Sequence, residues 1–150
     1  MKLLRVGDKG SEKPALLHTD GTTRDLSSVV PDITGKTIDA AGLARIKAAD
    51  ASKLPTLDGK LRIGPCVGNV GKFICVGLNY ADHAAESNMP IPSEPILCMK
   101  ATSAIIGPND TVVVPKNSTK CDWEVELGVV IGKETRYVDE KDALSHVAGY

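Results

Sequence analysis

The chain has 150 residues and a formal net charge of −1, and 42% of its residues are hydrophobic and 25% charged. That composition is typical of a folded globular protein and excludes wholesale disorder. The near-neutral charge and the aromatic content of 3% exclude a basic, base-stacking surface, so we expect no nucleic acid partner.

No apolar run approaches the ~20 residues that cross a bilayer, and the N-terminal apolar stretch is too short for a signal peptide. We therefore expect a cytoplasmic protein with no membrane partner. The cysteine spacing fits neither a zinc pair nor a compact disulfide framework. A cysteine nucleophile stays an alternative, although no local signature supports it. We expect free, mostly buried thiols at Cys66, Cys75, Cys98 and Cys121.

Residues 1–70 predict a small N-terminal α/β region of short strands and one helix. Asp20-Gly21 separates two apolar runs and is a hairpin signal. Strands are predicted at residues 1–6, 15–18 and 23–26. A helix is predicted at residues 37–49, with a shared apolar face of Ile38, Ala41, Leu43 and Ile46.

Residues 71–120 predict strands, turns and a second helix. The stretch at residues 72–77, whose apolar run at residues 73–76 is bounded by glycines, is typical of a buried strand. Asn79 is expected to cap a helix at residues 79–87, and the prolines that follow exclude further helix. The elements predicted next are a loop at residues 90–95, a strand at 96–100, a turn at 107–110 and a strand at 111–114.

Residues 122–131 predict one long strand, and residues 138–147 predict a short helix. Because side chains alternate along a strand, Asp122, Glu124 and Glu126 would share one face. The opposite face is predicted to pack in the core and comprises Trp123, Val125, Leu127, Val129 and Ile131. The chain as a whole thus predicts a β-rich α+β fold.

Three carboxylates on one strand face would repel one another unless a cation neutralises them. A hard divalent cation such as Mg²⁺, Mn²⁺ or Ca²⁺ does so, because it prefers oxygen ligands. The alternative is a solvated acidic face with no ligand, since an isolated Glu-x-Glu pair is a weak motif. The pattern alone leaves both interpretations open.

His83 and Glu86 lie three residues apart and would share a helix face. A carboxylate beside an imidazole fixes its tautomer and raises its basicity, which makes a general base able to activate water. An ordinary polar helix face is the alternative. Lys100 ends an apolar strand, where it is either solvated or anchors an acidic substrate and stabilises an enolate.

Four ordered segments together resemble the fumarylacetoacetate hydrolase family. They are GLNYADHAAE at residues 77–86, PxxPxxCMKxxSAIIGPND at 92–110, DWEVELGVVIGK at 122–133 and AxxxVAGY at 143–150. The resemblance is strong over residues 71–150 and much less specific over residues 1–70. It implies a small N-terminal domain followed by the first, incomplete part of a β-rich mixed roll, usually in a homodimer.

The resemblance also implies roles for particular residues. Glu124 and Glu126 match metal ligands, with Mg²⁺ expected and Mn²⁺ or Ca²⁺ as alternatives. His83 and Glu86 match a dyad that activates water or moves a proton. Lys100 matches a lysine beside the metal.

Tyr80 matches a position near the substrate mouth, whereas Asp122 is expected to support the site rather than to bind metal. The third ligand, an aspartate, is expected beyond Tyr150. The isolated 150-residue chain is therefore expected to bind metal weakly and to show no turnover.

The activity implied is that of a divalent-metal-dependent hydrolase or lyase. It would act on a small 2-oxo acid or related carboxylate through a metal-stabilised enolate. The members most similar in appearance are bacterial proteins labelled ureidoglycolate lyase or fumarylacetoacetate hydrolase family protein. Ureidoglycolate and acylpyruvate- or fumarylacetoacetate-like acids are therefore the candidate substrates. Two alternatives stay open: an isomerase or decarboxylase of the same family, and a non-catalytic binding or assembly module that keeps the fold.

Overall fold

The computed structural model describes all 150 residues and divides them into two compact units. One unit comprises residues 1–69 together with 106–150, and the other comprises residues 70–105. Eight strands and three α-helices make a mixed, β-rich α/β architecture. None of the helices has the length and apolar character needed to cross a membrane. These units are defined by compactness, so they do not test the predicted domains at residues 1–70 and 71–150, which stay a prediction.

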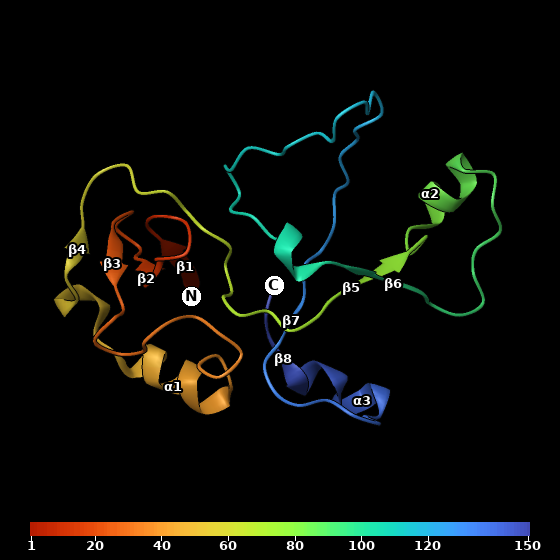
Figure 1. Ribbon diagram of the computed structural model, residues 1–150. Coiled ribbons are helices and arrows are strands. Elements are labelled where there is room, and N and C mark those ends of the chain that lie inside the picture. The colour runs from red at the N-terminus through yellow and green to blue at the C-terminus, as the bar shows by residue number, and fades with distance from the viewer. The chain divides into compact units, whose positions relative to one another are not determined.

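The first unit contains an antiparallel sheet with the strand order β1-β2-β3-β4 (Figure 1). Between the second and third strands, Gly21 has a φ of +84° and Asp20 Oδ1 accepts a hydrogen bond of 2.8 Å from the Thr22 amide. Glycine adopts this positive φ without a side-chain clash, and the predicted hairpin is confirmed. The strands are β1 (Lys2–Val6), β2 (Lys13–Leu17), β3 (Thr23–Asp25) and β4 (Thr56–Leu57).

Helix α1 (Ala40–Ala48) follows Asp39, whose Oδ1 accepts a hydrogen bond of 2.7 Å from the Gly42 amide. An aspartate at this position satisfies one of the unpaired amides of the first helical turn. The helix predicted at residues 37–49 is confirmed in place but begins later. The predicted buried face is wrong at one position, because Ala41 is exposed and Gly42 is buried instead. The backbone carbonyl of Thr37 lies so close to Gly42 that a Cβ at this position would collide with it.

The hydrophobic core of this unit is formed by residues that lie on α1 and in the chain that precedes it. Its buried members are Leu26, Val30, Ile33, Ile38 and Ile46. Apolar side chains from the sheet and from both ends of the unit pack against it, namely Leu3, Leu16, Val29, Leu43, Leu54, Val67, Val130 and Ala148. The N-terminal residues thus bury their own apolar surface, which is the main driving force for folding.

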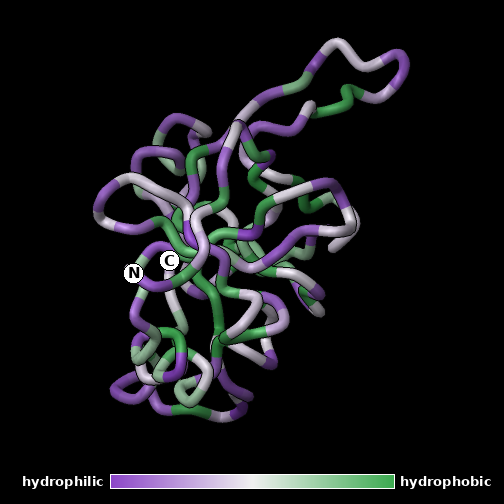
Figure 2. The backbone as a smooth tube through the Cα atoms, turned by 90° about the vertical axis from the view of Figure 1, so that its left-hand side faces the viewer, coloured by the Kyte–Doolittle hydropathy of each residue, from purple (hydrophilic) through white to green (hydrophobic).

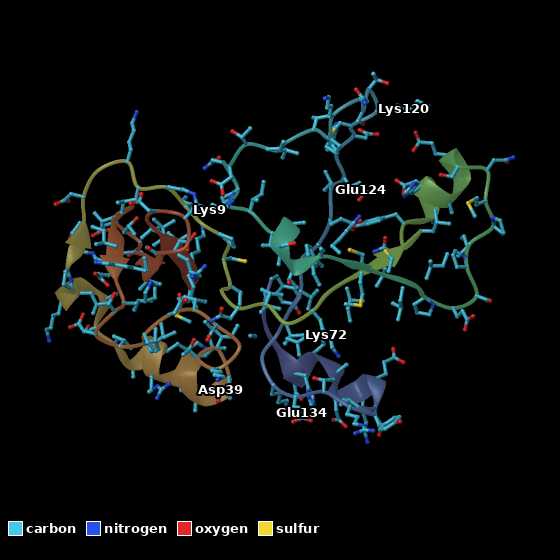
Figure 3. The ribbon with its side chains drawn as sticks, viewed as in Figure 1. Lys9, Asp39, Lys72, Lys120, Glu124 and Glu134 are labelled. Carbon is cyan, nitrogen blue, oxygen red and sulfur yellow. The ribbon has the colours of Figure 1, made fainter.

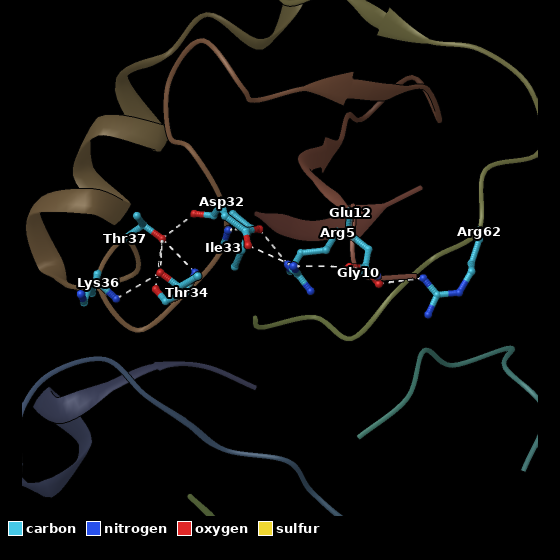
Figure 4. Close-up of polar contacts among 9 residues, drawn as sticks. All are labelled: Arg5, Gly10, Glu12, Asp32, Ile33, Thr34, Lys36, Thr37 and Arg62. Carbon is cyan, nitrogen blue, oxygen red and sulfur yellow. Dashed lines mark hydrogen bonds and ion pairs between the residues drawn. The ribbon is translucent and has the colours of Figure 1, made fainter. Parts of the chain in front are cut away.

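A chain of ion pairs runs through the first unit, and Figure 4 shows most of its members. Arg5 donates to both carboxylate oxygens of Asp32, at 2.7 and 3.0 Å, and its Nη2 lies 3.6 Å from Glu12 Oε2. Arg62 donates to Glu12 at 2.8 Å and to the two oxygens of Asp110 at 2.8 and 2.6 Å. Such two-point contacts fix the orientation of both groups, so the ion pairs tie the N-terminal strands to the segment after residue 105.

The second unit is an antiparallel hairpin whose connection contains a short helix (Figure 1). Both predicted strands and the proline loop are confirmed, but the expectation of a buried first strand is wrong, since its residues are exposed or half-buried. Tyr80 occupies the N-cap position predicted for Asn79, and no side chain caps the helix there. The elements are β5 (Phe73–Gly77), α2 (Ala81–Glu86) and β6 (Ile96–Lys100).

The C-terminal part of the first unit has little regular structure. The turn predicted at residues 107–110 is confirmed by a hydrogen bond of 3.1 Å from the Asp110 amide to the Gly107 carbonyl. The helix predicted at residues 138–147 is shorter than expected. The elements are β7 (Val130–Ile131), α3 (Glu140–Ala143), a 3-10 turn (Leu144–His146) and β8 (Val147–Gly149), which pairs with β7.

One predicted strand and most of another are absent. Residues 111–114 and 122–129 form no strand (Figure 1), and the predicted core face of the second is exposed, with Trp123 at 78%. A strand persists only where a neighbouring strand pairs its amides and carbonyls. No strand pairs with these residues, so their alternating pattern does not produce a strand.

Large apolar side chains remain exposed along much of residues 70–131. Figure 2 shows that hydrophobic residues occur in many separate stretches along the backbone. The expectation of mostly buried thiols is also wrong, because three of the four cysteines, Cys66, Cys98 and Cys121, are exposed.

Candidate functional site

Helix α2 contains the predicted site residues His83 and Glu86 and begins directly after a third, Tyr80. Tyr80 is the N-cap residue, and His83 and Glu86 lie three residues apart on the helix. The segment is helical because it is rich in alanine, the strongest helix former, and only Ala84 is buried. All three site side chains are exposed, and no hydrogen bond or ion pair joins His83 to Glu86.

Lys100 is the last residue of β6 and lies opposite Phe73 of β5. Its side chain is exposed, and it projects from the same face of the hairpin as that of Cys98, two residues earlier. Residues 70–105 therefore contain the lysine together with Tyr80 and the His-Glu pair.

Glu124 and Glu126 lie in the irregular stretch of the first unit, and Figure 3 labels the first of them. Both side chains are exposed, and neither forms an ion pair. Asp122 differs from them, because its Oδ1 accepts a hydrogen bond of 2.8 Å from the Trp123 amide. The common strand face predicted for the carboxylates is not seen, since the strand itself is not formed.

The donor chemistry of Glu124 and Glu126 fits a hard divalent cation, because carboxylate oxygens are preferred ligands of Mg²⁺ and Mn²⁺. Their number gives only a partial site. No group of three or more histidine, cysteine, aspartate or glutamate residues in the structure could hold a metal. Mg²⁺ is often bound by one or two carboxylates plus water and substrate, so the chemistry of the two glutamates fits part of such a site.

One hollow of the first unit, lined by residues from both ends of the chain, contains none of the predicted site residues. It has a volume of about 330 Å³, and Lys2 has the only charged side chain in its lining. An apolar hollow without converging polar groups offers no acid–base chemistry. Its apolar lining includes Leu3, Ile33, Ile38, Leu43, Val67 and Val130.

The polar cluster that the structure does assemble is centred on Arg62. Hydrogen bonds from its guanidinium lower the pKa of Asp110 to about 2 and hold the pKa of Glu12 below its ordinary value. The sequence predicts only a turn at Asp110 and indicates no role for Arg62. Arg62 and Asp110 are 48 residues apart, so no local pattern could have identified the pair.

Comparison with protein families gives a match over residues 72–150 to a model described as fumarylacetoacetate (FAA) hydrolase C-terminal. The matched stretch is more than half of the chain. It contains all six predicted site residues: Tyr80, His83, Glu86, Lys100, Glu124 and Glu126.

Curated relatives match the chain over its whole length. Proteins from Burkholderia lata and Burkholderia multivorans, each named "putative hydrolase", are 59% identical to it over 150 residues. The alignment covers 100% of this chain and 53% of each relative. The chain therefore spans about half the length of the curated relatives it matches.

Two solved structures are similar in fold. A protein from Mycobacterium smegmatis, described as a "putative HpcE protein", matches with a TM-score of 0.79 and 30% identity. Fumarylacetoacetate hydrolase from Exiguobacterium antarcticum matches with a TM-score of 0.74 and 27% identity. Each match covers 98% of this chain and 52% of the other, so the fold corresponds to about half of those proteins.

Proposed function

The chain belongs to the fumarylacetoacetate hydrolase family, and we propose that it supplies the metal-binding carboxylates and acid–base residues of a metal-dependent hydrolase. The observation that carries the proposal is the family match over residues 72–150, because that stretch holds every residue assigned to the chemistry. The hydrolase names of the Burkholderia relatives support the same activity.

Glu124 and Glu126 would hold the cation, with Mg²⁺ as the first candidate and Mn²⁺ or Ca²⁺ as alternatives. When bound, the cation supplies Lewis acidity toward a carboxylate and an adjacent oxygen of the substrate. The two glutamates lie outside any strand, so the backbone around them has to become ordered for their carboxylates to converge.

His83 would accept or deliver a proton at one imidazole nitrogen, while Glu86 holds the proton on the other. Their spacing on α2 allows this contact through side-chain rotation alone. Lys100 would pair its ammonium group with a substrate carboxylate, and Tyr80 would line the entrance to the site.

The substrate class that fits this donor set is a small 2-oxo acid or related carboxylate. One of the similar solved proteins is named fumarylacetoacetate hydrolase, which favours an acylpyruvate- or fumarylacetoacetate-like substrate over ureidoglycolate. A cytoplasmic homodimer belongs to the same proposal.

Calorimetric titration with Mn²⁺ tests the metal-binding part of the proposal. The chain should bind Mn²⁺ weakly, and the E124Q/E126Q variant should lose that binding because its amides carry no charge. A chimaera that joins this chain to the part of the Burkholderia lata relative that it does not cover should bind more tightly and hydrolyse an acylpyruvate.

The matched control is the E94Q/E134Q variant, which removes the same charge from two exposed glutamates with no assigned role. It should bind Mn²⁺ as the unaltered chain does. Equal binding by the unaltered protein and E124Q/E126Q, in both the chain and the chimaera, would remove the metal from the proposal.

A further inference from the structure

Two of the four cysteines lie directly opposite each other across the hairpin of the second unit. The strand register pairs Cys75 of β5 with Cys98 of β6. Directly paired residues of antiparallel strands have Cα atoms about 4.5–5.5 Å apart and side chains on the same face. A disulfide spans Cα separations of about 4.4–6.8 Å, so the register places the two Cα atoms in the range that a disulfide bridges.

The same two cysteines are accessible to different degrees. Cys98 is exposed and Cys75 is half-buried, so a small reagent reaches Cys98 first. The pairing is regular on both sides of the two cysteines, where Ile74 pairs with Met99 and Val76 pairs with Leu97. Cys66 and Cys121 belong to the other unit and lie in no strand, so neither is presented in this way.

We propose that Cys75 and Cys98 form a redox-active dithiol, which a low-molecular-weight disulfide such as oxidised glutathione converts to an intramolecular disulfide. The Cys98 thiolate attacks one sulfur of the reagent, forms a mixed disulfide and expels one thiolate. Cys75 Sγ then attacks Cys98 Sγ, which forms the protein disulfide and expels the second thiolate. Two electrons pass to the reagent, and the two cysteine protons end on the two thiols released.

The bond would close a loop of residues 76–97, which contains α2 and the proline-rich connection. It would also lie on the face of the hairpin from which Lys100 projects. Oxidation thus constrains the segment that carries Tyr80, His83 and Glu86. The dithiol stands independently of the proposed function, and only its effect on the chemistry rests on that function.

A thiol map of the reduced 150-residue chain tests the proposal. The chain is exposed to oxidised glutathione without denaturant, alkylated and digested with trypsin. Residues 73–100 contain no internal cleavage site, so both cysteines fall in one peptide, whereas Cys66 and Cys121 fall in two others. In the oxidised chain this peptide should be lighter by two hydrogen atoms and should carry no alkyl group. After a further cleavage at Glu86, its two fragments should stay joined until the disulfide is reduced.

Two variants control the experiment. C66S/C121S should form the same disulfide as the unaltered chain, because neither replaced residue takes part. In C98S the loss of two hydrogen atoms should vanish, and Cys75 should be alkylated or carry glutathione. The proposal is overturned if the peptide carries two alkyl groups while Cys66 or Cys121 is oxidised, or if its cysteines bond to another chain.

Discussion

Residues 1–69 and residues 70–131 differ in how much of their apolar surface they bury. The first stretch contains the four-stranded sheet, α1 and the buried core cluster. In the second stretch Ala84 is the only buried hydrophobic side chain, although β5, β6 and residues 122–131 are all rich in apolar residues.

The difference shows which part of the fold depends on contacts from elsewhere in a protein. The N-terminal strands pair with their sequence neighbours and enclose a core made of nearby residues. The matched family stretch has open strand edges and exposed apolar faces, which folded proteins usually cover with other strands, helices or chains. The Burkholderia relatives contain roughly as many residues again as this chain.

The largest expected effect is the difference in the free energy of unfolding between truncating a core leucine and truncating an exposed one. Leu26 is 0% exposed and Leu127 is 67% exposed. Leu26→Ala should lower the free energy of unfolding by about 2–5 kcal/mol, because it leaves a cavity in a packed core. Leu127→Ala, the matched change, should alter it by less than about 0.5 kcal/mol. Urea denaturation followed by circular dichroism measures both, and similar losses in the two variants would show that Leu26 and Leu127 are equally well packed.

A smaller loss of stability is expected at acidic pH. Arg62 lowers the pKa of Asp110 from 3.8 to about 2 and also lowers the pKa of Glu12. A carboxyl group whose pKa is lower in the folded state stabilises the fold fully above its unfolded pKa. The contribution is lost as the pH falls toward the folded pKa. The urea midpoint should therefore fall between about pH 4 and about pH 2.

Asp110→Asn sharpens this measurement, since it removes one of the titrating groups. Its urea midpoint should depend less on pH than that of the unaltered chain. Asp58→Asn is the matched control, because Asp58 is exposed and forms no ion pair. An Asp110→Asn variant that follows the unaltered chain at every pH would contradict the role of the Arg62–Asp110 pair.

The sequence predicted those elements whose causes are local. The β2–β3 hairpin follows from its Asp-Gly turn, and β5, α2 and β6 follow from bounded apolar runs and alanine content. Of the strand expected at residues 122–131, only the last two residues form a strand. An alternating pattern gives a strand only where a neighbouring strand pairs with it.

The candidate site divides in the same way. The spacing of His83 and Glu86 placed them correctly on one helix, because an i, i+3 relation is local. Whether Glu124 and Glu126 converge depends on the backbone around them, which no local pattern describes. Long-range pairs such as Arg5 with Asp32, 27 residues apart, were likewise beyond prediction.

Amide hydrogen exchange of the 150-residue chain, followed by mass spectrometry of its peptides, tests the central contrast most directly. Amides of β1, β2 and α1 should exchange slowly, because their hydrogen bonds belong to elements that pack on the closed core. Residues 111–129 should exchange at the rate of an unstructured peptide. Protection of residues 122–129 equal to that of β1 would contradict the account, since it would show that the stretch bearing Glu124 and Glu126 already has a partner strand.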